Sequence, residues 1–256
     1  RGSFDPIAVY NNQPLQGTPM SYSFLIALGA ALGLLQIYRH TSSKESSRAV
    51  DAGLISMAGA MLGARLAFVL MHISYYKNHL PEILQLWQGG LHVFGAIAGG
   101  LLTAAILSLF WKKGFLQLTD LVVPLIPPLA IFAILGSWQA GVAYGAAALE
   151  GAWWGVKALD ESGAYLPRFP LQLVTALVLL LYYGFLEIRP PLFWNYGSKT
   201  VCYLAGLAAV LTFTSFLRAD PAPVYGRMRL DTWLNLAVLA ACIPAWIYVH
   251  RRGTGL

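Results

Sequence analysis

Long apolar runs fill most of this chain, and the short polar stretches between them carry few charges. Charged residues make up 11% of the 256 residues, and apolar residues make up 57%. A soluble globular domain has about 25% charged residues, because its surface must face water. The composition therefore argues against a soluble enzyme, a disordered chain and a nucleic-acid-binding module. It indicates a chain that is mostly embedded in lipid.

The apolar runs have the length of membrane-spanning helices, since about 20 apolar residues of helix cross the hydrocarbon core of a bilayer. They predict an all-α polytopic integral membrane protein with about seven transmembrane helices, in a single transmembrane domain over residues 1–256. Their richness in Leu, Ala and Gly favours helices over a barrel of short alternating strands. Two outer segments, 74–90 and 150–168, carry aromatic side chains suited to the headgroup layer. The predicted spans lie near 19–38, 53–72, 91–111, 117–136, 169–186, 197–217 and 231–249.

Basic residues set the predicted orientation, because Lys and Arg are enriched on the cytoplasmic side of a membrane. Nine of them lie on the side that holds the C-terminus and the connections after the first, third and fifth spans, against seven on the other side. Lys112-Lys113 and Arg251-Arg252 directly follow span ends. We therefore expect a multi-pass protein with its N-terminus outside and its C-terminus in the cytoplasm.

Ionisable residues inside the predicted spans are candidate functional residues, because burying a charge in lipid is costly unless it is paired or wet. Arg65 lies well inside the second span. Asp120 lies near the start of the fourth, where a carboxylate is expected to cap the helix rather than to act in chemistry. His92, at the start of the third span, is more typical of an interfacial hydrogen-bonding residue than of a base.

The fourth span contains three prolines at 124, 127 and 128, followed by a stretch with Gly136 and Gly141. Prolines remove backbone donors, so an irregular helix is expected there, beside a cavity or packed closely against a neighbour. Gln172 adds a neutral hydrogen-bonding group at the start of the fifth span. The two cysteines, Cys202 and Cys242, lie in apolar runs without CxxC spacing, so neither a metal site nor a cofactor is predicted.

Several short segments stand out together because of their order along the chain. They are Gly63-Ala64-Arg65-Leu66, Trp87-Gln88-Gly89-Gly90, Thr119-Asp120 through Pro127, Leu135-Gly136-Ser137 through Tyr144-Gly145, Pro167-Arg168-Phe169-Pro170 with Gln172-Leu173, and Phe216-Leu217-Arg218. In this order they resemble the bacterial prolipoprotein diacylglyceryl transferase family over most of the chain. The resemblance implies a reaction that moves a diacylglyceryl group from phosphatidylglycerol to the lipobox cysteine of a prolipoprotein. Such chemistry needs cations to hold the phosphate and a base to take the thiol proton.

The chain departs from the family where that chemistry is expected. The family histidine corresponds to Phe94, and His92 is two residues early, about 200° away on a helix. Two family arginines correspond to Ile134 and Leu211. The family asparagine and glutamate correspond to Ser137 and Ser215, and the family's Ser-Gln-Leu-Tyr-Glu reads Leu171-Gln172-Leu173-Val174-Thr175. The residues left as candidates for lipid or phosphate binding are Arg65, Gln172, Arg218, Gly89 and Gly90.

These departures favour a diverged, catalytically inactive relative in the bacterial inner membrane. It would bind a phosphatidylglycerol-like phospholipid and serve as an accessory subunit beside other membrane-protein subunits, with no nucleic acid as partner. The alternative is an active transferase with a rearranged site, in which Arg65 and Arg218 hold the phosphate and His92 or a loop residue is the base. Whether the chain is an enzyme is left open at this point. A transporter or channel rests only on the broken fourth span, and a serine protease only on Ser137.

Overall fold

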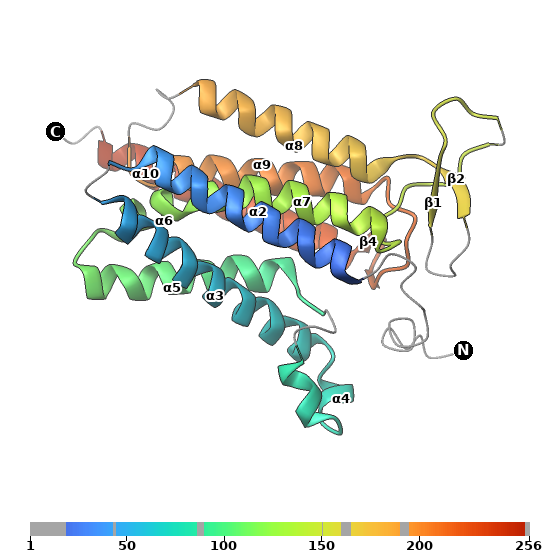
Figure 1. Ribbon diagram of the computed structural model, residues 1–256, viewed down its shortest axis with the longest axis horizontal. Coiled ribbons are helices and arrows are strands. Elements are labelled where there is room, and N and C mark those ends of the chain that lie inside the picture. Colours follow the sequence, from blue (N-terminus) through green and yellow to red (C-terminus); the bar gives the residue numbers. More distant parts are fainter. Residues whose placement is uncertain are drawn as a thin grey trace. The chain divides into compact units, whose positions relative to one another are not determined.

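The computed structural model describes residues 19–42, 45–85, 90–149, 151–159, 165–189 and 195–253, and most of them are helical. Figure 1 shows the order of the elements along the chain. Among the described residues, two short antiparallel strand pairs and three short helical elements lie between the long helices. The long helices are α2 (Pro19–His40), α3 (Ser46–Met71), α5 (Val93–Trp111), α6 (Phe115–Val122), α7 (Ile126–Gln139), α8 (Leu171–Ile188), α9 (Ser198–Ser215) and α10 (Leu230–Gly253). The short elements are α4 (Ile73–Tyr76), η1 (Leu80–Leu84), η3 (Val123–Leu125), β1 (Val156–Leu159), β2 (Tyr165–Arg168), β3 (Val224–Tyr225) and β4 (Met228–Arg229).

The prediction of an all-α polytopic membrane protein is confirmed. Within the described part of the chain, six helical stretches are long and apolar enough to cross a membrane, and they contain α2, α3, α5, α6 with α7, α8 and α10. The remaining predicted span, 197–217, coincides with α9, which does not reach the same apolar standard. Its first turn, Ser198-Lys199-Thr200, is polar. The predicted count of about seven therefore corresponds to six apolar spans together with α9.

The fold divides into two compact units. The first unit comprises Arg1–Gly33, Ile126–Leu192 and Val201–Leu256, and the second comprises Leu34–Leu125 and Phe193–Thr200. The single transmembrane domain remains a prediction.

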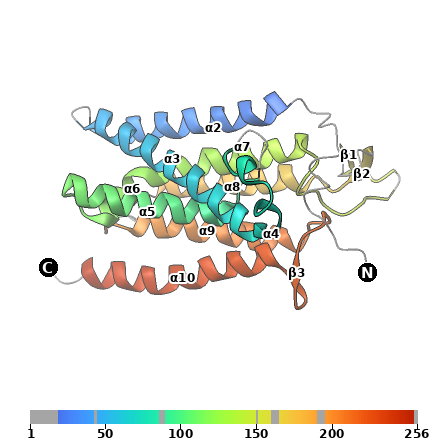
Figure 2. The ribbon, with the colours of Figure 1, turned by 90° about the horizontal axis from the view of Figure 1, so that it is seen from below.

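In the second unit, α3 and α5 cross each other (Figure 2). Glycines lie where the two helices meet. A Cβ atom on Gly63 would lie 2.4 Å from the carbonyl oxygen of Gly95. A Cβ atom on Gly99 would lie 2.3 Å from the carbonyl oxygen of Gly59. The two backbones are thus in direct contact, the packing that small residues permit between membrane helices. Next to this contact, the buried side chains of Ala52, Leu107 and Leu118 form a small apolar core with Trp111, Leu121 and Val122 around it.

The predicted break in the fourth span is present. Helix α6 ends at Val122, the 3-10 turn η3 contains Pro124, and α7 begins at Ile126. Pro127 and Pro128 then lie in the first turn of α7, where a missing backbone N–H has no helical partner to lose. The break also coincides with the boundary between the two units.

In the first unit, close helix packing surrounds residues 128–136. A Cβ atom on Gly29 would lie 2.9 Å from the carbonyl oxygen of Pro128, and one on Gly136 would lie 2.6 Å from Cδ2 of Tyr22. The sequence left open whether this stretch lies beside a cavity or packs closely against a neighbouring helix. These contacts favour close packing.

Aromatic residues join α8 to α9 in the same unit. The Tyr182 ring occupies the space beside Gly206, where a Cβ atom would lie 1.9 Å from Cε1 of that ring. The Tyr183 hydroxyl donates to the Tyr203 carbonyl at 3.3 Å, and the Tyr203 hydroxyl donates to Glu187. Tyr203 is fully buried. The β1–β2 hairpin leads into the start of α8 (Figure 1).

Candidate functional site

Arg65 on α3 is buried, with 5% of its surface exposed, and its guanidinium binds backbone carbonyls. Nε donates to Ile83 at 2.9 Å and Nη2 donates to Glu82 at 2.6 Å, both on η1. Nη1 donates to Gly90 at 3.2 Å. The rings of Phe68 and Tyr76 lie 5.9 and 5.4 Å from the guanidinium carbon. The charge that the sequence singled out is therefore solvated by carbonyl dipoles and aromatic faces.

The segment that follows α3 (72–85) folds back so that its carbonyls reach Arg65. The Tyr75 hydroxyl donates to the Glu82 carboxylate at 2.8 Å, and the Tyr75 ring stacks on His79 at 4.2 Å. Gly90 closes the turn with φ of +72°, and a Cβ atom there would lie 2.5 Å from Cε1 of Phe68. Only glycine suits this position. Gly89, the other glycine predicted as a lipid-binding residue, lies outside the described residues.

His92 lies just before the first residue of α5, beside the turn of α3 that carries Arg65. Its backbone N–H donates to the Ala64 carbonyl at 3.1 Å. Its half-buried ring lies 5.4 Å from the ring of Phe94, measured between centroids. The structure thus brings the His92 backbone next to residue 65, whereas the chemical role of the imidazole stays a prediction.

Gln172 and Arg218, the candidates in the first unit, both hold the loop that follows α7. The Gln172 side chain, 3% exposed, donates to the Val142 carbonyl at 3.0 Å. Ala143 has φ of +59°, a conformation that non-glycine residues rarely adopt, so the loop needs such support. On the other side, Arg218 forms a β-bridge with Gly145, and Ala219 N–H donates to Tyr144 at 2.9 Å. The two predicted ligands therefore act on one loop.

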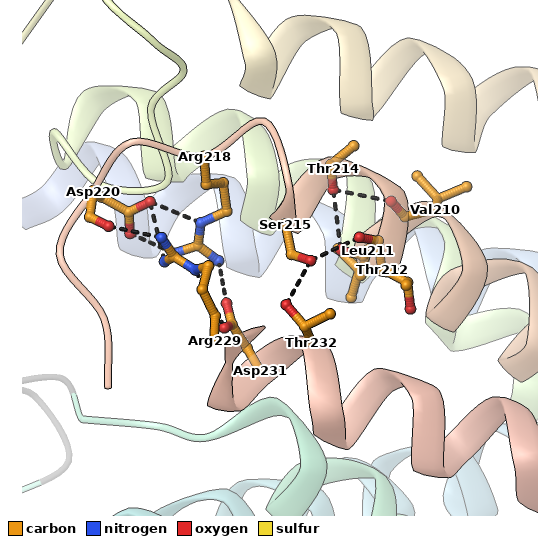
Figure 3. Close-up of polar contacts among 10 residues, drawn as sticks. All are labelled: Val210, Leu211, Thr212, Thr214, Ser215, Arg218, Asp220, Arg229, Asp231 and Thr232. Carbon is orange, nitrogen blue, oxygen red and sulfur yellow. Dashed lines mark hydrogen bonds and ion pairs between the residues drawn. The ribbon is translucent and has the colours of Figure 1, made fainter. Parts of the chain in front are cut away.

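The Arg218 side chain belongs to a four-residue ion network, drawn in Figure 3. It donates twice to Asp220, at 2.8 and 2.5 Å, and once to Asp231, at 3.0 Å. Arg229 lies 3.3 Å from both carboxylates and donates to the Asp220 carbonyl at 2.7 Å. Two arginines and two aspartates cancel in formal charge. The sequence analysis did not predict this network. A repeated Arg-x-Asp pattern could have indicated it, in Arg218-Ala219-Asp220 and Arg229-Leu230-Asp231.

Hydroxyl groups stand at several positions where the family resemblance implies other polar groups, and each bonds a carbonyl of its own helix. Ser137 donates to Ile134 at 2.7 Å, and Thr175 donates to Leu171 at 2.6 Å. Ser215 bonds the Thr212 carbonyl at 2.7 Å and also meets the Thr232 hydroxyl at 2.8 Å (Figure 3). Ser215 and Thr232 are almost completely buried. Such local bonds satisfy a hydroxyl within the helix.

Asp120 is a capping residue, but of a different helix from the one predicted. It lies in the last turn of α6, which begins at Phe115, so it cannot cap its own helix. Its carboxylate accepts hydrogen bonds from Gly197 N–H at 2.6 Å and from the Thr200 N–H and hydroxyl at 2.8 and 2.6 Å. Gly197 directly precedes α9 and Thr200 lies in its first turn, where free N–H groups and the helix dipole favour a carboxylate.

Replacing Asp120 with alanine should expose this dependence. Loss of a cap typically costs 0.5–2 kcal/mol, and because three hydrogen bonds are lost we expect a decrease in the free energy of unfolding of about 2 kcal/mol. Thermal unfolding of the detergent-solubilised protein, followed by circular dichroism, measures the change. Asp51→Ala, at an exposed position of α3, is the control. Equal melting temperatures for the two variants would contradict the capping role.

Within the described residues, no group of three or more His, Cys, Asp or Glu side chains is placed to hold a metal ion. Cys202 and Cys242 are not joined to each other by a disulfide.

Comparison with known proteins gives a consistent result over nearly the whole chain. The family model described as prolipoprotein diacylglyceryl transferase matches residues 16–248. Similar proteins include the phosphatidylglycerol–prolipoprotein diacylglyceryl transferases of Methylibium petroleiphilum, 26% identical over 97% of both chains, and of Cupriavidus necator, 28% identical over 98% of this chain and 95% of the other. A third, from Burkholderia mallei, is 25% identical over 98% of this chain and 96% of its own.

Proposed function

The chain belongs to the prolipoprotein diacylglyceryl transferase family, and we propose that it is a diverged, catalytically inactive member that binds phospholipid. It is a transferase-like, multi-pass membrane protein of a bacterial inner-membrane family. Our proposal adds that it serves as an accessory subunit of a membrane assembly, with its N-terminus outside and its C-terminus in the cytoplasm.

The observation that carries the proposed inactivity is the hydrogen bonding of the two arginines that the family resemblance leaves as phosphate ligands. The proposed phospholipid binding is supported by the family to which the chain belongs. To grip a phosphate through the same N–H groups, Arg65 would have to release the Glu82, Ile83 and Gly90 carbonyls. Each buried acceptor left without a donor costs about 1–3 kcal/mol. That cost opposes the use of Arg65 in phosphate binding.

The guanidinium of Arg218 is also already bound, in this case to two carboxylates. The Asp220 and Asp231 carboxylates lie 2.5–3.0 Å from its guanidinium nitrogens, so an approaching phosphate would meet two negative charges. Displacing them would leave two half-buried carboxylates to repel the ligand. A phosphate site at Arg218 therefore lacks the net positive charge that binding of an anion requires.

The substituted positions support the same conclusion. Phe94, Ile134 and Leu211 supply neither a base nor a cation, and Ser215 uses its hydroxyl on Thr212 and Thr232. Replacement of an unneeded buried charge by a packed apolar side chain is commonly neutral or stabilising. The two arginines that remain, Arg65 and Arg218, are hydrogen-bonded within the protein without substrate.

The second candidate, an active transferase with a rearranged site, is favoured by one contact. The His92 N–H bond to Ala64 holds the backbone of a potential base next to the Arg65 turn, in the same unit. In that case His92 would take the thiol proton while Arg65 exchanged a carbonyl for the phosphate.

A turnover assay separates the two candidates. We expect the purified protein, mixed with phosphatidylglycerol vesicles and a lipobox peptide, to release glycerol phosphate no faster than vesicles without protein. The Cupriavidus necator relative, prepared in the same way, is the positive control. Phosphatidylglycerol should nevertheless raise the melting temperature of the protein in detergent, because a ligand that binds only the folded state stabilises it.

Turnover that disappears in the His92→Phe variant, with the melting temperature unchanged, would contradict inactivity and support the rearranged site. Lack of any shift of the melting temperature by phosphatidylglycerol, relative to phosphatidylethanolamine, would contradict the proposed lipid binding.

A further inference from the structure

Leu149 and residues 151–155, which follow α7 and precede β1, present the most exposed large apolar side chains among the described residues. Trp153 is 94% exposed and Leu149 is 82% exposed. Ala152 N–H donates to the Leu149 carbonyl at 3.1 Å, and Gly155 N–H donates to the Ala152 carbonyl at 2.9 Å. We call Leu149 and residues 151–155 the tryptophan turn.

The tryptophan turn is fixed at both ends by backbone hydrogen bonds. On its N-terminal side, Ala148 N–H donates to the Pro167 carbonyl at 2.8 Å. On its C-terminal side, Val156 begins β1, which pairs with β2 in the register Val156↔Arg168. Arg168, in turn, stacks on the Tyr144 ring at 4.1 Å. Trp153 and Leu149 are therefore exposed on a segment that backbone hydrogen bonds hold on both sides.

Trp154 places the turn at the level where a membrane span begins. Its ring meets the ring of Phe169 edge-on, with centroids 6.0 Å apart. Phe169 lies directly before Pro170 and the first residue of α8, and α8 is one of the six apolar spans. Its first turns expose apolar side chains, such as Leu173 and Leu177, that face lipid in a membrane. The apolar surface of the turn thus continues the lipid-contacting surface of α8.

We infer that the tryptophan turn is a membrane anchor, whose Trp153 and Leu149 side chains insert into the boundary between headgroups and acyl chains. Tryptophan concentrates at this depth because its ring is apolar and its N–H is polar. Lys157, exposed on the adjoining strand β1, supplies a cation for anionic headgroups. The occupant of the surface is the lipid bilayer itself. This inference does not depend on whether the protein has transferase activity.

A nitroxide spin label at position 153 tests the anchor. The full chain is first freed of its native thiols by Cys202→Ala and Cys242→Ala. Single-cysteine variants Trp153→Cys, Leu181→Cys and Arg251→Cys are then labelled and reconstituted in vesicles of phosphatidylethanolamine and phosphatidylglycerol. Leu181 is the lipid reference, because it is 64% exposed in the middle of α8. Arg251, exposed at the end of α10, is the aqueous reference.

Power saturation with oxygen and with a water-soluble nickel chelate measures the depth of each label. We expect the ratio of oxygen to nickel accessibility at position 153 to resemble that at 181 and to exceed that at 251 several-fold. A ratio equal to that at 251 would place the turn in water and overturn the inference. Protection of the 153 label from both reagents would also overturn it, because a protein partner would then cover the turn.

Trp153 itself can be tested without a label. In vesicles that contain lipids brominated near the headgroup end of the acyl chain, quenching of total tryptophan fluorescence should be lower in Trp153→Phe than in the native protein. Equal fractional quenching in both proteins would show that Trp153 makes no contact with lipid.

Discussion

Replacement of Gly99 by alanine is expected to force α3 and α5 apart and to lower the free energy of unfolding by about 3 kcal/mol, the upper part of the usual range for overpacking. The added Cβ atom would lie 2.3 Å from the Gly59 carbonyl oxygen and 3.0 Å from the Gly63 Cα atom. Both are backbone atoms of α3, so no side-chain rotation can relieve the clash. Urea or thermal unfolding of the protein in detergent measures the loss.

Gly100 is the matched control, because it follows directly on the same helix. A Cβ atom there would lie 3.7 Å from the Ala60 Cβ atom, an ordinary van der Waals contact. Gly100→Ala should therefore be neutral, or stabilising by roughly 0.5–1 kcal/mol, since alanine loses less conformational freedom in a helix. If Gly99→Ala and Gly100→Ala unfold alike, the backbone contact between the helices is not as described.

Replacement of Arg65 by methionine, which keeps the length of the side chain but removes its donors, is expected to destabilise the protein by roughly 3 kcal/mol or more. Three backbone carbonyls lose their donors, and each buried unsatisfied acceptor costs about 1–3 kcal/mol. The segment 72–85 should also lose its attachment to α3. Faster proteolysis within this segment, together with a lower melting temperature, would measure both effects.

Arg48→Met provides the control, because Arg48 is an exposed arginine on the same helix. It should change neither the melting temperature nor the cleavage rate. If Arg65→Met keeps native stability and loses only the stabilisation by phosphatidylglycerol, then Arg65 serves as a lipid ligand and its carbonyl contacts are incidental.

The sequence predicted the helices well wherever lipid determines their composition. The predicted runs 19–38 and 91–111 match α2 and α5 within two residues at each end. By contrast, α3 starts at Ser46, well before the predicted residue 53. The prediction missed these first turns of the helix because they are polar. Hydropathy detects the part of a helix that contacts hydrocarbon, and it cannot detect a polar turn that continues the helix into water.

The sequence identified the charged residues of the candidate site but not the groups that they bind. Arg65 stood out because an arginine inside an apolar run is costly, but its partners are backbone carbonyls, which have no sequence signature. Arg218 was predicted as a phosphate ligand through the family resemblance. The local pattern Arg-Ala-Asp contained its real partner, two residues along the chain. Local spacing would have identified Asp220, whereas Asp231 required the fold of the β3–β4 hairpin.

The cap on α9 has a consequence for how the chain is made. Asp120 accepts hydrogen bonds from Gly197 and Thr200, which lie 77 and 80 positions further along. A growing polypeptide therefore delivers this carboxylate to the membrane long before its donors have been translated. During that interval the Asp120 carboxylate lacks these donors, so the cap on α9 can form only after residues 197–200 have been made.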